Sequence, residues 1–180
     1  MEPIPFDKRS GKIWFNGQPS NWADAQIHVL NHGLHYASCV FEGERVYNGK
    51  IFKLEEHTDR LFHSADRLGF EIPYSKESIN KACKDIVEIQ KVKNGYVRPV
   101  VWRGSEMMAI SAQKTKIHVA IATWEWGSYF DPNLKLKGIK LNISEWRRPA
   151  PNTIPWDTKA SGLYMICTLS KHAAEKEGFT

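Results

Sequence analysis

The chain has 180 residues, of which 42% are hydrophobic and 25% charged, a balance typical of a globular protein with a sizeable core. Its net charge of +5 is scattered, with no long Lys/Arg block, which argues against a nucleic-acid-binding module and fits a protein that handles anionic small molecules. No apolar run approaches the roughly 20 residues that cross a bilayer, and residues 1–10 lack the features of a signal peptide.

The cysteines and histidines are the candidates for disulfide or metal sites. Cys39, Cys83 and Cys167 are far apart in the sequence and form no CxxC pair, so we expect reduced thiols in a cytoplasmic protein. His28, His32 and His35 have a spacing at which helical residues share a face, which makes a metal site one interpretation. Because the segment contains a glycine and no carboxylate, we favour structural hydrogen bonds and expect no metal.

The first part of the chain predicts mostly strands. Residues 12–17 resemble a short strand closed by an Asn-Gly turn, and residues 26–30 are a second strand candidate. Residues 39–47 and 50–54 flank a second Asn-Gly pair, which predicts a hairpin because both central positions of a type I′ turn need positive φ.

Two helices and two strands are expected next. Apolar periodicity predicts a helix over 54–68, closed by Gly69, and a second helix from a Ser75 cap to about residue 91. The first helix has an expected polar stripe, made of His57, Arg60, Ser64 and Arg67. Residues 95–103 and 116–124 predict strands, so the segment to this point indicates a compact α+β domain.

The composition changes after residue 125. We therefore predict a small α+β domain over 1–125, an aromatic linker over 126–137, and the start of a second, larger unit over 138–180. Within the second unit, residues 138–146 alternate as a strand would, and residues 163–176 have helical periodicity that Gly178 would close.

Lys159 stands out in this second unit. It lies between a proline-containing loop and the helical run, with small residues on both sides and Tyr164 five residues later. Small neighbours let a bulky ring approach the backbone, and a lysine amine can form a Schiff base with an aldehyde. From this stretch alone, a solvated surface lysine is the simpler interpretation.

Four ordered motifs change that balance. They are residues 150–159 (Ala-Pro-Asn-Thr-Ile-Pro-Trp-Asp-Thr-Lys), 35–43 (His-Tyr-Ala-Ser-Cys-Val-Phe-Glu-Gly), 96–99 (Tyr-Val-Arg-Pro) and 124–129 (Trp-Glu-Trp-Gly-Ser-Tyr). Together they resemble fold-type IV pyridoxal-phosphate enzymes, and among these the branched-chain amino acid aminotransferases, over about residues 12–178. The resemblance implies an N-terminal α+β domain of that type, followed by the beginning of the larger C-terminal domain.

The resemblance also implies roles for individual residues. Lys159 would be the catalytic lysine that binds pyridoxal 5′-phosphate, Tyr164 would lie near the ring hydroxyl, and Arg60 would hold the phosphate. Arg98 would pair with the γ-carboxylate of glutamate. The residues matched to the substrate pocket are Tyr36, Phe41, Tyr96, Arg98, Trp126 and Tyr129. Core packing is the alternative for the aromatic ones, Phe41 above all, and a half-buried helix residue is an equally good interpretation of Tyr164.

The activity that this resemblance implies is amino transfer between leucine, isoleucine or valine and 2-oxoglutarate, in an assembly that is at least a homodimer. Members of the family continue well beyond the lysine, and the later part supplies a carboxylate for the pyridine nitrogen. We therefore expect this chain alone to be incomplete. Two alternatives stay open: an inert remnant that folds or oligomerises, and a D-amino acid aminotransferase or aminodeoxychorismate lyase of the same fold type.

Overall fold

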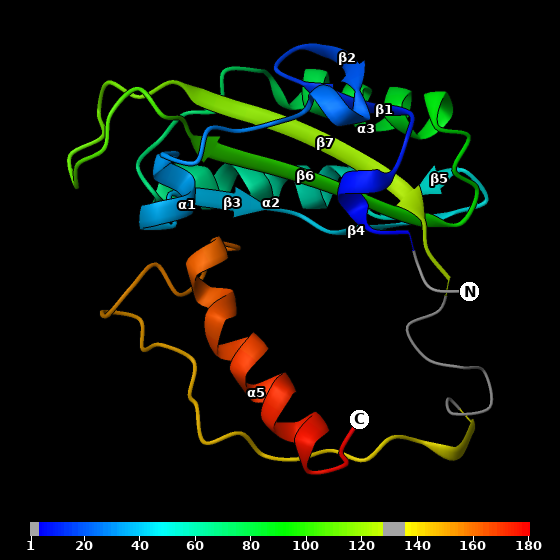
Figure 1. Cartoon of the computed structure of the whole chain (residues 1–180), viewed down its shortest axis with the longest axis vertical. Helices are drawn as coiled ribbons and strands as arrows, with labels where there is room; N and C mark the ends of the chain where they lie inside the picture. Colours follow the sequence, from blue (N-terminus) through cyan, green and yellow to red (C-terminus); the bar gives the residue numbers. More distant parts are fainter. Residues whose placement is uncertain (1–3, 128–135) are drawn as a thin grey trace.

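A computed structural model describes residues 4–127 and 136–180. Within these residues the main feature is one antiparallel sheet of seven strands (Figure 1). The strands are β1 (Lys12–Phe15), β2 (Gln18–Asn21), β3 (Cys39–Phe41), β4 (Glu44–Tyr47), β5 (Lys50–Ile51), β6 (Gly95–Arg103) and β7 (Ile117–Glu125). Their order is β2-β1-β7-β6-β4-β5, and β3 also pairs with β6. One edge of β6 therefore carries two separate strands, β3 and β4.

Pro99 lies in the middle of β6, where a proline normally removes a ladder hydrogen bond. Glu42 and Gly43, which separate β3 from β4, lie opposite this point, and the Glu42 amide donates to the Pro99 carbonyl at 2.9 Å. The N–H and C=O of one residue in an antiparallel pair point to the same side, so the missing N–H of Pro99 faces this break. The proline is therefore tolerated, and the sheet edge opens at Glu42.

Two long helices cover one face of the sheet and close the core. They are α2 (Leu54–Arg67) and α3 (Lys76–Ile89), and both lie behind the sheet in Figure 1. Leu61 on α2 and Ile79 and Ile86 on α3 are fully buried against strand residues such as Val97 and Ile121. Burying each such side chain contributes about 1.5–3 kcal/mol, so these helices hold the sheet together.

The remaining helices are shorter or more peripheral. They are α1 (His32–Tyr36), α5 (Met165–Lys176) and the 3-10 turns η1 (Phe6–Lys8), η2 (Trp22–Asp24) and η3 (Ser161–Tyr164). Helix α5 leads away from the sheet (Figure 1) and contains no buried residue. Among the described residues, no helix has the length and apolarity that crossing a membrane requires.

Most locally encoded predictions are confirmed. Asn48 and Gly49 have φ of 49° and 75°, as the type I′ turn between β4 and β5 requires. The Ser75 side chain accepts a hydrogen bond from Ser78 N at 3.2 Å and caps α3. Gly69 and Gly178 follow α2 and α5 with positive φ, as predicted for helix-closing glycines.

Three strand predictions need correction. The strand expected over residues 39–47 is interrupted at Glu42 and Gly43 and becomes β3 and β4. Residues 26–30 and 138–146, all of which the structure describes, form no strand. Their apolar side chains, including Ile27, Val29, Leu141 and Ile143, are exposed, and no strand among residues 4–127 and 136–180 pairs with these segments. Helix α1 was not predicted, since five residues containing a glycine carry little helical signal.

Ser64 is a further correction. The periodicity places it on the polar stripe of the first helix, but it is fully buried. His57 is partly buried, while Arg60 and Arg67 are exposed. The burial of Ser64 has a specific cause, which lies in the loop that carries Lys159.

Candidate active site

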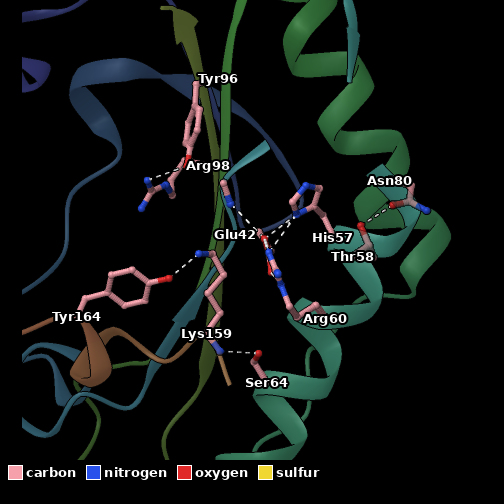
Figure 2. A network of polar contacts seen from close by, with 11 residues as sticks. Glu42, His57, Thr58, Arg60, Ser64, Asn80, Tyr96, Arg98, Lys159 and Tyr164 are labelled. Carbon is pink, nitrogen blue, oxygen red and sulfur yellow. Dashed lines mark hydrogen bonds and ion pairs between the residues drawn. The ribbon is translucent and has the colours of Figure 1, made fainter. Parts of the chain in front are cut away.

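The backbone of Lys159 is held from two sides. The Phe41 amide donates to the Lys159 carbonyl at 3.1 Å, and Val40 and Ala160 form an isolated antiparallel bridge. From the other side, the Lys159 amide donates to Ser64 Oγ at 3.0 Å. The lysine is therefore fixed between β3 and α2, and the buried hydroxyl on α2 is explained by this bond (Figure 2).

The loop before Lys159 has its own anchors on α2. Asp157 lies 3.4 Å from Arg67 Nε through one carboxylate oxygen and 3.4 Å from His63 Nε2 through the other. Thr158 is buried, and its hydroxyl donates to the Pro155 carbonyl at 2.6 Å. These contacts hold the loop close to the helix and so limit the positions that the lysine can reach.

The side chain of Lys159 points between two aromatic rings. Its Nζ donates to Tyr164 Oη at 2.6 Å (Figure 2). The same Nζ lies 4.8 Å from the centroid of the Phe41 ring. The Phe41 and Tyr164 rings contact each other, with centroids 4.8 Å apart. Cation–π contacts with both rings and the phenol hydrogen bond thus give the amine a defined direction.

Arg60 on α2 is bound to a buried carboxylate. Its Nε and Nη2 donate to Glu42 Oε1 and Oε2 at 2.6 and 2.8 Å, and His57 Nδ1 lies 2.8 Å from Oε2. Burial alone raises the pKa of Glu42, but the hydrogen bonds from Arg60 and His57 outweigh it and lower the pKa to about 2. The hydrogen bond between Arg60 and Glu42 raises the pKa of Arg60. Glu42 is therefore ionised, and Arg60 carries a fixed positive charge.

One cavity of about 370 Å³ brings these groups together. Arg60, Lys159 and Tyr164 contribute to its wall, as do Trp156 and Arg148, whose Nη2 donates to the Trp156 carbonyl at 3.1 Å. An amine, a phenol and a guanidinium around one space are suited to an anionic aldehyde, since the amine can add to the carbonyl carbon and the guanidinium can bind the anion.

A second group of side chains surrounds Arg98 on β6. The guanidinium carbon of Arg98 lies 4.6 Å from the Phe41 ring centroid and 5.3 Å from that of Tyr96, and its Nη2 donates to Tyr96 Oη at 3.4 Å. The Tyr96 ring contacts that of Trp126, with centroids 5.1 Å apart. A Cβ on Gly43 would lie 1.7 Å from Tyr96 Oη, so this arrangement needs glycine at position 43.

A larger cavity of about 630 Å³ opens beside Arg98. Most of its wall is apolar, including Phe15, Val100, Trp102 and Ala120, and the loop just after Lys159 borders it as well. The Arg98 Nε atom is buried without a hydrogen-bond partner among the described residues. A space of this kind suits a ligand with an aliphatic body and a carboxylate.

The structure therefore gathers most of the residues that the sequence singled out. Lys159, Tyr164 and Arg60 line one cavity, and a continuous set of contacts runs from Lys159 through Phe41, Arg98 and Tyr96 to Trp126.

Tyr36 is the exception among the described residues. It is 45% exposed, its ring stacks on His32 at a centroid distance of 4.6 Å, and it belongs neither to the 370 Å³ cavity nor to that set of contacts. Tyr129 lies outside the described residues.

Sequence reasoning missed the two residues that hold these groups in place, Glu42 and Ser64. A glutamate inside a run of strand-like apolar residues was the available signal for Glu42, since a carboxylate is rarely fully buried unless it is paired. Ser64 had no such signal, because its partner is the backbone of a residue 95 positions away.

The three histidines weighed for metal binding contact the backbone instead. His32 Nε2 lies 2.9 Å from the Ala109 carbonyl and His35 Nε2 lies 2.9 Å from the Val29 carbonyl, while His28 Nδ1 accepts from the Leu30 amide at 3.0 Å. Across residues 4–127 and 136–180, no group of three or more His, Cys, Asp or Glu side chains is arranged to hold a metal ion. The hydrogen bonds that the sequence favoured for these histidines are present, each to the backbone.

Comparison with known proteins identifies the class. The family model for amino-transferase class IV matches residues 39–180. The probable branched-chain-amino-acid aminotransferase of Rickettsia conorii is 40% identical over 179 residues, which cover 99% of this chain and 60% of that protein. The crystal structure of the Escherichia coli branched-chain amino acid aminotransferase superposes with a TM-score of 0.90 at 35% identity, covering 95% of this chain and 58% of that chain.

A third relative has been solved with ligands. The T.th. branched-chain amino acid aminotransferase with pyridoxamine 5′-phosphate has a TM-score of 0.90 and 35% identity, covering 95% of this chain and 58% of that chain. The same enzyme complexed with N-(5′-phosphopyridoxyl)-L-glutamate has a TM-score of 0.85 and 33% identity, covering 95% and 56%.

The chain belongs to the amino-transferase class IV family, since the family model matches well over half of its residues. It spans about 60% of the length of the curated relatives that it matches. The prediction of an α+β fold of the fold-type IV aminotransferase N-terminal type is confirmed.

Proposed function

We propose that the cavity around Lys159 binds pyridoxal 5′-phosphate. The observation that carries this proposal is the Lys159 amine, 2.6 Å from Tyr164 Oη in the same cavity as the Arg60 guanidinium. Each group fits one part of the cofactor: the amine its aldehyde, the phenol its ring hydroxyl and the guanidinium its phosphate. When bound, the cofactor supplies a ring that withdraws electrons from the α-carbon of an amino acid.

The three residues have separate roles in this proposal. Lys159 would hold the cofactor through its amine and move the proton of the substrate α-carbon, because its backbone is fixed between β3 and α2 and its amine is directed into the cavity. Tyr164 orients that amine through the 2.6 Å hydrogen bond. Arg60 binds the phosphate and so keeps the ring in one place relative to the lysine.

We propose amino transfer between branched-chain amino acids and 2-oxoglutarate as the reaction. The apolar cavity beside Arg98 supports this substrate class, because it offers room for an aliphatic side chain and a cation for a carboxylate. Phe41, Tyr96 and Trp126 are proposed as substrate-binding residues because their rings join Lys159 to Arg98 and its surroundings. We include Tyr36 and Tyr129 as further substrate-binding residues. The T.th. enzyme complexed with a phosphopyridoxyl derivative of glutamate supports glutamate as the second amino acid.

We also propose the organisation of the protein. Residues 1–125 form the small domain, since the sheet, α2 and α3 all lie within them. Residues 126–137 form the linker, of which 128–135 lie outside the described part, and residues 138–180 belong to a larger cofactor-binding unit. A cytoplasmic protein that assembles at least as a dimer is the arrangement we expect.

The proposal is tested by visible absorption of the protein loaded with pyridoxal 5′-phosphate. We expect a protein-bound band that the Lys159→Ala variant lacks. Bleaching of this band by L-valine but not by D-alanine would support the first half of the proposed reaction, which does not require the full cycle that we expect this chain alone not to complete. Bleaching by D-alanine alone would transfer the proposal to a D-amino acid aminotransferase. A band that no amino acid changes would contradict amino transfer by this chain and favour an inert cofactor-binding protein.

A further inference from the structure

Glu42 is the most completely buried charged group next to the proposed cofactor site. Its side chain has no exposed surface, and it lies at the break between β3 and β4. Its backbone amide is bound to the Pro99 carbonyl, and the Gly43 amide lies 3.3 Å from its Oε2. The carboxylate therefore has a rigid support on the sheet, although the proposed reaction assigns it no role.

The contact between Glu42 and Arg60 leaves one side of the guanidinium available. Glu42 takes the Nε and Nη2 donors, which lie on the same edge of the planar group. Nη1 makes no hydrogen bond among the described residues, and the Arg60 side chain is 50% exposed where it borders the 370 Å³ cavity. His57 holds the carboxylate from another direction, with Nδ1 2.8 Å from Oε2. The guanidinium is thus clamped along one edge only.

We propose that Glu42 is a positioning residue that presents the Nη1 edge of Arg60 to the phosphate of the cofactor. This inference rests on the proposed function of the cavity. A long, half-exposed arginine side chain samples many rotamers, and the bidentate contact removes most of them before the phosphate arrives. The carboxylate also reduces the net positive charge near the phosphate, so the benefit lies in orientation and not in added charge.

Two ligands that differ only in the phosphate distinguish a positioning role of Glu42 from a purely structural one. Pyridoxamine 5′-phosphate and pyridoxamine have no aldehyde, so neither depends on a covalent bond to Lys159. Their dissociation constants can be measured by quenching of tryptophan fluorescence, since Trp156 borders the cavity. A general loss of folding weakens both ligands alike and leaves their ratio unchanged, whereas a misplaced Arg60 lowers the preference for the phosphorylated one.

Glu42→Gln keeps the shape but brings an amide NH₂ against the donors of Arg60 and His57. We expect it to reduce the preference for the phosphorylated ligand about tenfold, which corresponds to about 1.4 kcal/mol. Arg60→Ala should reduce the preference at least as much, and adding Glu42→Gln to it should have no further effect. The matched control is Glu56→Gln, because Glu56 is exposed and lies on α2 like Arg60. This variant should leave the preference for the phosphorylated ligand unchanged.

Glu42→Asp provides a second test if Glu42→Gln fails to fold. It keeps the charge but withdraws the carboxylate by about 1.5 Å, one carbon–carbon bond. If Glu42 positions Arg60, Glu42→Asp should reduce the preference for pyridoxamine 5′-phosphate over pyridoxamine. If Glu42 acts only through its charge, this preference should not change. The inference would be overturned if a folded Glu42 variant kept the wild-type preference for the phosphorylated ligand. It would also be overturned if the wild type showed no such preference. If the preference behaves as expected but pyridoxal 5′-phosphate forms no adduct with Lys159, the proposed function fails and the positioning role stands.

Discussion

The buried carboxyl group of Glu44 should make the free energy of unfolding decrease as the pH rises. It lies on β4 with only 1% of its surface exposed, and neither carboxyl oxygen has a hydrogen-bond partner among the described residues. Burial is the main cause that raises its pKa from 4.5 to about 8, and the charge of Glu42 adds to it. The buried thiol of Cys83 is also close enough to interact with it. Glu44 is therefore neutral in the folded protein at neutral pH.

The direction and size of the effect follow from linkage. Because the folded-state pKa lies above the unfolded-state value, the stability is fully present below about pH 4.5 and declines as the pH rises through about 8. The slope is at most about 1.4 kcal/mol per pH unit, so the free energy of unfolding should fall by on the order of 3 kcal/mol between pH 5 and pH 8. Glu44→Gln should remove this decline.

Urea denaturation of the wild type and of Glu44→Gln at pH 5, 7 and 9 measures the effect. The difference between the two curves isolates Glu44, since the other titrating groups are common to both. Glu44→Met, which keeps the volume but removes the unpaired oxygens, should be more stable than the wild type at every pH, by about 1–3 kcal/mol at pH 5. Glu55→Gln, exposed on α2, is the control and should follow the wild type. Parallel pH curves for the wild type and Glu44→Gln would refute the argument.

Three further substitutions test the site and the fold. Ser64→Ala should remove the hydrogen bond to the Lys159 amide, reduce the free energy of unfolding by about 1 kcal/mol in urea, and slow adduct formation with pyridoxal 5′-phosphate. Gly43→Ala should displace Tyr96 and weaken binding of 2-oxoglutarate, measured by calorimetry, while affinity for pyridoxamine 5′-phosphate stays unchanged. Gly49→Ala meets no neighbouring atom but has a φ of +75°, so it should cost about 1 kcal/mol in urea without altering either ligand. The first expectation would be contradicted by an unchanged adduct rate in Ser64→Ala, and the second by unchanged 2-oxoglutarate affinity in Gly43→Ala. The third would be contradicted by unchanged stability in Gly49→Ala.

Features that depend on neighbouring residues could be predicted from the sequence. The Asn-Gly turn at 48–49, the Ser75 cap and the glycines that close α2 and α5 follow from backbone preferences at single positions. The two long helices follow from the 3.6-residue periodicity of their buried side chains. Lys159 was singled out by the resemblance of four ordered motifs, because its own stretch taken alone favoured a surface lysine.

Features that depend on residues far apart in the chain could not be predicted from the sequence. Residues 26–30 and 138–146 have strand-like apolar residues, but a strand forms only where a neighbouring strand offers a ladder, and none in the described part of the chain does so there. The burial of Ser64 and Glu42 depends on partners far along the chain, namely the Lys159 backbone and the Arg60 guanidinium. Tyr36 was matched by its motif, and its ring stacks on His32, outside the contacts that join Lys159 to Trp126.

The central claim is that this chain builds a site in which Lys159 alone reacts with pyridoxal 5′-phosphate. The most direct measurement is borohydride reduction of the purified chain with the cofactor, followed by peptide mass mapping, with Lys159→Ala as the control. We predict one stoichiometric adduct on the peptide that contains Lys159 and none in the variant. Adducts scattered over many surface lysines, or equal labelling of the wild type and the variant, would contradict the account.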